Sequence, residues 1–205
     1  MKPIDETTLR RTLAAGRDDA VAAAERLARE AADGGLVDVA YATHETPLGT
    51  TVLAATDRGL VRLALPGAVV DEVLDDLAAE VSPRVLELPA RLDAVRRELD
   101  EYFAGDRERF DLALDWRLVH GGFQRKVLRA AESRLPFGVT ASYGEVATWA
   151  GSPRAFRAAG TALARNPLPI VVPCHRVLRA GGTIGQYGGG PEMKQRLLRL
   201  EGAIG

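Results

Sequence analysis

The chain has 205 residues, 46% of them hydrophobic and 27% charged, with a net charge of −1 and one cysteine. This length suits one large domain or two small ones, and the composition is ordinary for a soluble globular protein. A lone cysteine excludes an internal disulfide and a cysteine-rich zinc site, so we expect no metal. No apolar run approaches the roughly 20 residues of a membrane span. The N-terminus lacks the apolar core of a signal peptide, and its acidic residues argue against an organellar transit peptide, so we expect a cytoplasmic protein.

The charge is distributed unevenly along the chain. Residues 118–205 contain twelve Lys and Arg against four Asp and Glu, a net +8, whereas residues 1–117 carry a net −9. A basic half beside an acidic half indicates a domain that meets a polyanion. Attraction between the two halves explains the same pattern, and charge alone does not decide between these interpretations.

Residues 1–36 predict a helical N-terminal extension of unknown role. They are rich in Ala, Arg, Asp and Glu, and the pattern favours two short helices broken near Gly16. The second, over about 18–32, has apolar residues at helical spacing and ends at Asp33-Gly34-Gly35. We expect a solvated appendage.

Residues 37–105 predict a small α/β domain. Apolar alternation over 37–43 and β-branched or apolar runs over 50–55 and 60–65 indicate an antiparallel meander. Helical spacing predicts helices over 70–80 and 92–103. No catalytic group of residues stands out in this domain, and we expect its His44 at the surface. The polar stretch 106–117 is predicted to be a linker.

Residues 118–205 predict a mostly helical second domain, which makes the chain α+β. Helices are expected over 123–134, from Ser142 to about Ala150 and over 153–164. Ser142 and Glu145 form the pattern of a capping box. A tight glycine-containing turn between the last two helices is typical of a helix-turn-helix. A short apolar strand over 170–172, a glycine-rich loop over 181–190 and a final helix over 191–201 complete the domain.

The only cysteine lies in a sequence context that indicates reactivity. Cys174 follows Pro173 and precedes His175 and Arg176, and both of these bases can favour a thiolate. A buried, inert cysteine is the usual alternative for a lone thiol. Adjacent residues of an extended chain point to opposite sides. We therefore expect His175 to reach the sulfur only through a bridging water, and only if the backbone turns here.

A histidine acting as a base also needs an acid to orient its imidazole. The second domain has no aspartate and four glutamates, which are Glu132, Glu145, Glu192 and Glu201. Glu201 is attractive because it ends the last helix. Spacing alone does not select it.

These residues resemble the O6-alkylguanine-DNA alkyltransferase family. The resemblance rests on Pro-Cys-His-Arg-Val after Asn-Pro-hydrophobic-Pro, and it is strongest over 123–202. It continues more weakly over 37–103, through Thr46-Pro-Leu-Gly49, and does not cover 1–33. It implies a winged-helix-like DNA-binding domain after a small α/β domain.

The resemblance also implies roles for the reacting groups. Cys174 matches the alkyl acceptor, and His175 matches the water-linked base that deprotonates it. Glu201 matches the acid that orients this histidine. Asn166 matches the asparagine that supports the active-site turn.

A further set of residues is implied to contact the flipped base. Tyr143 matches the tyrosine that contacts this base and helps to rotate its phosphate. The carbonyls of Val177 and Cys174 would accept the exocyclic amine of guanine, Tyr187 would line the pocket, and the Gly188 amide would donate to O6. Arg176 belongs to the same expected base-binding set.

The helix-turn-helix is implied to enter the minor groove of DNA. Arg157 matches the arginine finger that fills the stack once the base has left, which lowers the cost of flipping. Ala158 and Gly160 belong to a run of small residues that permits close approach to the sugar-phosphate backbone. The basic excess would supply affinity for phosphates.

The resemblance implies a DNA-repair protein that moves an alkyl group from O6 of guanine, or O4 of thymine, to its own Cys174, once per molecule and without a cofactor. We expect a monomer, and cooperation on DNA stays open. One alternative is a non-catalytic protein that recognises alkylated bases and recruits repair factors, although the relatives of that kind lack the cysteine. Another is a cysteine hydrolase, which would turn over repeatedly.

Overall fold

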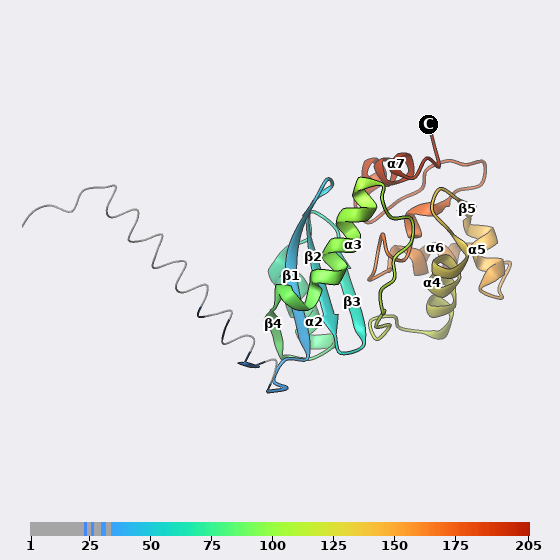
Figure 1. Ribbon diagram of the computed structural model, residues 1–205. Coiled ribbons are helices and arrows are strands. Elements are labelled where there is room, and N and C mark those ends of the chain that lie inside the picture. Colours follow the sequence, from blue (N-terminus) through green and yellow to red (C-terminus); the bar gives the residue numbers. More distant parts are fainter. Residues whose placement is uncertain (1–22, 24–25, 27–29, 32–33) are drawn as a thin grey trace, which may run out of the picture.

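A computed structural model describes residues 23, 26, 30–31 and 34–205. A sheet domain and a helical domain lie side by side (Figure 1). Most of the extension predicted over 1–36 lies outside the described residues. None of the helices in the described part is long and apolar enough to cross a membrane.

The first domain is built on a four-stranded sheet. β1 (Val39–Thr46), β2 (Gly49–Thr56) and β3 (Gly59–Ala64) pair in antiparallel succession, which confirms the predicted meander. A fourth strand, β4 (Val85–Glu87), pairs in parallel with β1, so the strand order is β3-β2-β1-β4. Sequence analysis missed β4 because three residues are too few to show a period of two.

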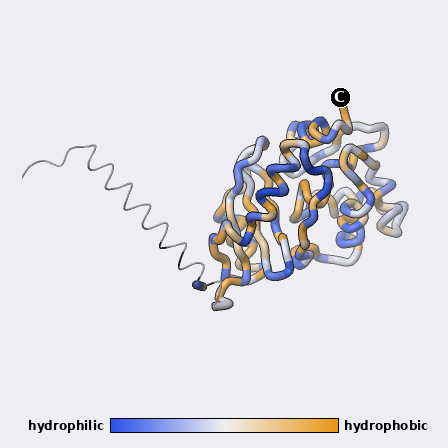
Figure 2. Tube along the Cα trace, viewed as in Figure 1, coloured by the Kyte–Doolittle hydropathy of each residue, from blue (hydrophilic) through white to orange (hydrophobic). Residues whose placement is uncertain are grey.

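Helices cover both faces of this sheet. α2 (Val70–Glu80) packs on one face, where Val73 and Leu77 join the buried side chains of the strands. A short 3-10 helix, η1 (Pro89–Leu92), leads into α3 (Asp93–Ala104) on the other face. Figure 2 shows hydrophobic stretches along the strands and alternating stretches along the helices, as expected for elements with one buried face.

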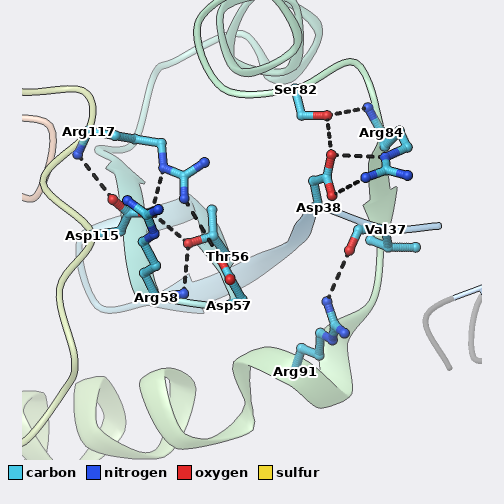
Figure 3. Close-up of polar contacts among 10 residues, drawn as sticks. All are labelled: Val37, Asp38, Thr56, Asp57, Arg58, Ser82, Arg84, Arg91, Asp115 and Arg117. Atoms are coloured by element: carbon cyan, nitrogen blue, oxygen red, sulfur yellow. Dashed lines mark hydrogen bonds and ion pairs between the residues drawn. The ribbon is translucent and has the colours of Figure 1, made fainter. Parts of the chain in front are cut away.

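The segment 106–117, predicted as a linker, lies against the sheet edge. Leu60 N donates to Ala113 O at 2.9 Å, and Asp115 N donates to Leu60 O at 2.8 Å. A Cβ on Gly59 would lie 2.1 Å from Ala113 O, so only glycine allows this approach. The carboxylate of Asp115 accepts from Thr56 Oγ1 at 2.6 Å and pairs with Arg117 Nε at 2.6 Å (Figure 3).

A second polar cluster in Figure 3 positions the short strand β4. Asp38 accepts from Ser82 Oγ at 2.5 Å and from Arg84 Nε at 2.9 Å and Nη2 at 2.6 Å. Arg84 immediately precedes β4, so these bonds join the start of β1 to its parallel neighbour.

The second domain is a three-helix bundle with a small sheet and a final helix. α4 (Gly122–Arg134), α5 (Tyr143–Trp149) and α6 (Phe156–Ala164) pack against one another. β5 (Ala141–Ser142) pairs in parallel with β6 (Val177–Leu178). α7 (Gly190–Leu200) closes the domain.

The sequence predicts a capping box, the start of one helix and the position of one histidine in these two domains. The Ser142 hydroxyl accepts from Glu145 N at 3.2 Å while the Glu145 carboxylate accepts from Ser142 N at 2.7 Å, which confirms the capping box. α6 begins at Phe156, later than predicted, because the chain from Ser152 to Ala155 closes a separate turn. His44 is buried and bonded to Asp100 at 2.8 Å, so its predicted surface position is wrong.

Candidate active site

A cavity of about 660 Å³ opens between α6, the cysteine turn and the glycine-rich loop. Cys174 lines it, with Asn166 beside the cysteine and Tyr187 and Gly188 from the loop. The first domain contributes Leu65, which follows β3. The cavity therefore combines the only thiol of the chain with several of the residues that the sequence analysis selected.

The predicted strand over 170–172 is wrong, because the chain makes a tight turn here. Asn166 organises this turn: its Nδ2 donates to Val172 O at 2.8 Å, and its Oδ1 accepts from Leu168 N at 3.0 Å. Ile170 sits at φ 73°, a conformation that a β-branched residue adopts only when its surroundings impose it.

The turn delivers Cys174 to the cavity in a short 3-10 helix, η2 (Cys174–Arg176). Asn166 Nδ2 also donates to the Cys174 sulfur at 3.2 Å. The backbone is therefore not extended at the cysteine, which meets the condition that the sequence analysis set for a water-bridged contact with His175.

Behind the cysteine, His175 and Arg176 share one carboxylate. His175 Nε2 lies 2.8 Å from Glu201 Oε1, and both side chains are fully buried. Arg176 donates to the same carboxylate from Nε at 2.8 Å and from Nη2 at 2.9 Å. Because a carboxylate only accepts, His175 carries its proton on Nε2 and turns the lone pair of Nδ1 away from Glu201.

The helix-turn-helix borders the mouth of the cavity. Arg157, Gly160 and Tyr143 all line it. The Arg157 guanidinium lies 5.2 Å from the ring centroid of Phe156, an aromatic side chain that is 48% exposed. Ala158 is exposed on the same helix. The small Gly185 is needed beside Tyr143, since a Cβ there would lie 2.9 Å from the Tyr143 hydroxyl.

Comparison with known proteins places the chain in a family. A family model described as "6-O-methylguanine DNA methyltransferase, ribonuclease-like domain" matches residues 39–116, and one described as the DNA binding domain of that protein matches residues 122–203. A Mycolicibacterium paratuberculosis methylated-DNA--protein-cysteine methyltransferase is 40% identical over 80% of this chain and 92% of its own length. The constitutive Bacillus subtilis protein of that name is 39% identical over 78% of this chain and 94% of its own.

A solved structure agrees with these sequence matches. The crystal structure of Mycobacterium tuberculosis OGT in complex with DNA is similar with a TM-score of 0.68 and 36% identity, over 79% of this chain and 92% of that one. The chain belongs to the 6-O-methylguanine DNA methyltransferase family. The resemblance seen in the sequence and the α+β fold are thereby confirmed.

In this methyltransferase the cysteine and histidine are neutral at rest. Burial raises the pKa of the Cys174 thiol, although the Asn166 hydrogen bond and the Lys194 charge act to lower it. Burial lowers the pKa of the His175 imidazolium, against the hydrogen bond and charge of Glu201. The groups that act to lower the thiol pKa are Asn166, Lys194 and the backbone of the cysteine turn, and burial outweighs them. Ionisation of the thiol has to accompany the reaction.

Arg176 does not lie where the sequence analysis put it. We expected it among the base-binding residues, but its guanidinium is buried against Glu201 and the Leu135 carbonyl. Its charge helps to hold Glu201 ionised: burial would raise the pKa of that carboxyl, but His175 and Arg176 lower it to about 2. Arg176 thus supports the acid of the site.

Two functional residues were missed by the sequence analysis. Lys194, fully buried on α7, donates to the Val177 carbonyl, and burial lowers its pKa to about 8. The signal was available, because Lys194 and Glu201 stand seven residues apart on the same stripe as Leu197 and Leu198. Tyr102 of α3 donates to Glu201 at 2.6 Å. No sequence signal indicates that contact, which spans 99 residues.

Two buried side-chain atoms in the described part of the chain make no hydrogen bond, and both belong to this site. They are Nδ1 of His175 and the hydroxyl of Tyr187. Buried polar atoms without partners are rare and favour a role in binding or proton transfer. Among the described residues no group of three or more His, Cys, Asp and Glu could hold a metal ion.

Proposed function

We propose that this family member repairs DNA by moving an alkyl group from O6 of guanine to the sulfur of Cys174. The observation that carries the proposal is the position of the thiol: it lines a cavity of about 660 Å³, held by Asn166 and followed by a buried His175–Glu201 pair. The chain is a DNA-repair methyltransferase whose acceptor is its own cysteine.

The transfer is a displacement at the alkyl carbon. The sulfur attacks this carbon, and the bond between carbon and O6 breaks with its electron pair going to the guanine. The thiol proton passes to Nδ1 of His175 through a bridging water, and the guanine leaving group takes up one proton in return. Thiol and O6-alkylguanine thereby become thioether and guanine, and no cofactor is needed.

Glu201 supports this proton transfer. Its carboxylate holds Nε2–H of His175, which leaves Nδ1 as the acceptor of the thiol proton. The carboxylate then stabilises the imidazolium that forms. The buried thiolate and the buried imidazolium, which are both unfavourable in free energy, therefore exist only during the reaction.

DNA is the partner of the second domain, and we assign the contacts as follows. α6 enters the minor groove, where Ala158 and Gly160 allow the sugar-phosphate backbone to approach closely. Arg157 fills the stack after the base has left. Tyr143, Tyr187 and the Gly188 amide receive the extruded base. The protein acts as a monomer on O6-alkylguanine and, by the same chemistry, on O4-alkylthymine.

A titration followed by intact-mass spectrometry tests the proposal. Increasing amounts of duplex oligonucleotide with one O6-methylguanine should add one methyl group per chain and then plateau, with the methyl mapped to Cys174. Cys174→Ala should gain no methyl group while still binding the duplex. Removal of more than one equivalent of methyl groups from the DNA, or removal of the methyl group without any modification of the protein, would refute the suicide reaction and favour a hydrolase. Binding without any loss of methyl from DNA would favour a non-catalytic reader.

A further inference from the structure

The first domain, which holds no reactive group, touches the acid of the site through a single hydroxyl. Tyr102 Oη on α3 donates to Glu201 Oε1 at 2.6 Å. The Tyr102 side chain is completely buried. The hydroxyl donates to this carboxylate alone among the described residues, beside the Arg176 guanidinium that binds the same carboxylate.

The tyrosine ring is fixed by three phenylalanines. Its centroid lies 5.2 Å from Phe103, 5.3 Å from Phe110 and 6.1 Å from Phe137, and two of these contacts are edge-to-face. Burial raises the pKa of the Tyr102 phenol, and the neighbouring Glu201 charge raises it further. The hydroxyl therefore remains a donor at every pH at which the protein works.

Three donors compete for one oxygen of Glu201. Oε1 accepts from Tyr102 at 2.6 Å, from His175 Nε2 at 2.8 Å and from Arg176 Nη2 at 2.9 Å. Oε2 accepts from Arg176 Nε at 2.8 Å and from Gly138 N at 3.4 Å. A carboxylate that accepts from several donors shares its negative charge among them. Each added donor therefore weakens the hydrogen bonds that the carboxylate makes to the others.

We propose that Tyr102 is a positioning residue through which the first domain fixes the Glu201 carboxylate and limits how strongly that carboxylate pulls on His175. The inference rests on the proposed function, because it acts through the base of the alkyl transfer. Tyr102 does not touch the substrate or the sulfur in this arrangement. Its effect reaches Cys174 only through Glu201 and His175.

The proposal predicts a direction. Without the hydroxyl, Glu201 Oε1 gives more of its charge to His175, which stabilises the imidazolium and raises the pKa of His175. His175 must be neutral to accept the thiol proton. As the pH falls, the variant would therefore lose alkyl transfer at a higher pH than the unmodified protein does. If Tyr102 served only in packing, its substitution would lower the stability of the fold and leave unchanged the pH at which alkyl transfer is lost.

The surrounding charges leave His175 as the group that titrates in the acidic range. Arg176 adjoins it in η2, and Lys194 faces it from α7 with a pKa lowered to about 8 by burial. Burial raises the pKa of Cys174 and of Tyr187, and that of Glu201 lies at about 2. A loss of rate as the pH falls therefore reports on the protonation of His175, whose pKa burial lowers from its ordinary value.

The test is the pH profile of alkylation by free O6-benzylguanine, which needs no DNA. Tyr102→Phe should move the midpoint of the acid limb upward by about 0.5 to 1 pH unit. Tyr41→Phe, a matched change in the same domain away from the site, should leave the midpoint in place. Phe110→Leu loosens the ring packing but keeps the hydroxyl, so it should lower stability and move the midpoint less than Tyr102→Phe does.

A second substitution keeps the test decisive if Tyr102→Phe fails to fold. Site-specific replacement of Tyr102 by 3-fluorotyrosine preserves the ring and makes the hydroxyl a stronger donor, so the midpoint should move downward. Opposite shifts for the two changes support the proposal, and so does the downward shift alone if the phenylalanine variant is unfolded. An unchanged midpoint in folded variants would overturn it. If the unmodified protein is not alkylated at Cys174 at all, the proposed function fails instead.

Discussion

The two domains of this methyltransferase differ in what they contribute to the cavity. The second domain supplies the thiol, the base and its acid, all between Asn166 and Glu201. The sheet domain supplies support: Leu63 N of β3 donates to Pro167 O at 2.9 Å, Leu65 lines the cavity, and Tyr102 donates to Glu201. A domain without reactive side chains can therefore still determine the geometry of an active site.

The contacts of the sheet domain reach two parts of the site. The hydrogen bond to Pro167 holds the chain next to Asn166, the residue that organises the cysteine turn. The bond from Tyr102 holds the acid behind His175. Changes in either domain should therefore affect the reaction, but through different quantities, and the following predictions separate them.

Removal of the Glu201 charge should have the largest effect. In Glu201→Gln the neutral amide can still accept from Nε2 of His175, but it no longer carries the negative charge that stabilises the imidazolium formed when Nδ1 takes the thiol proton. We expect the rate of Cys174 alkylation by O6-benzylguanine to fall roughly 10²- to 10⁴-fold, the usual contribution of general base catalysis. A variant that alkylates at the normal rate would exclude His175 as the base.

The same substitution should change how stability depends on pH. The pKa of Glu201 is lowered to about 2 in the folded protein from its ordinary value of 4.5. Its contribution to stability is therefore complete above the unfolded pKa and is lost as the pH falls through the folded one. Urea unfolding between pH 5 and 2 should show this loss in the unmodified protein, and Glu201→Gln should lack that component of the pH dependence.

Arg157→Ala should affect repair of duplex DNA but not the chemistry. The arginine matters only when a base has to be kept out of the stack, a step that costs a few kcal/mol, so we expect a loss of roughly tenfold to a hundredfold on duplex substrate. Alkylation by free O6-benzylguanine should be nearly unchanged. Equal losses on both substrates would indicate damage to the cavity and contradict the finger role.

The reacting groups could be predicted from the sequence because they occur in short local patterns. Cys174, His175 and Arg176 are adjacent, and Ser142 with Glu145 predicted a cap that the structure confirms. The turn at Ile170 was mistaken for a strand because an apolar run fits both. The side-chain bonds of Asn166, to the Val172 carbonyl six residues on and to the cysteine sulfur eight residues on, decide in favour of a turn.

The supporting contacts were beyond the sequence for a different reason. Helical spacing on α3 places Tyr102 with Val95 and Leu99 on the buried face, which predicts burial. It does not predict that the hydroxyl meets Glu201, because this depends on how two domains pack. The contacts of the predicted linker 106–117 could not be foreseen either, since its bonds to Leu60 are between backbone atoms and do not depend on residue type.

Asp115→Ala should lower the stability of the fold without changing the rate of Cys174 alkylation. The buried Asp115 carboxylate joins Thr56 of the sheet to Arg117 at the end of the segment 106–117. Its removal takes the acceptor from the half-buried Thr56 hydroxyl and from Arg117 Nε, which costs roughly 0.5 to 1.5 kcal/mol of unfolding free energy. Alkylation by O6-benzylguanine below the unfolding transition should be unchanged. Asp57→Ala, beside the same Arg117 but exposed, is the matched control with little effect.

Deletion of residues 1–33 should have the smallest effect of all. The family models begin at residue 39, and every contact assigned to the site comes from residues beyond 60. We therefore expect the deleted protein to alkylate Cys174 with O6-benzylguanine, and to repair duplex oligonucleotides, at rates within about twofold of the full chain. Changes away from a site usually alter its energetics by only about 0.5 kcal/mol. Its acid limb should also coincide with that of the full chain, because Tyr102, Glu201 and His175 are retained. A large loss confined to duplex DNA would instead assign the extension to DNA binding, and a shifted acid limb would place it within reach of the proton relay.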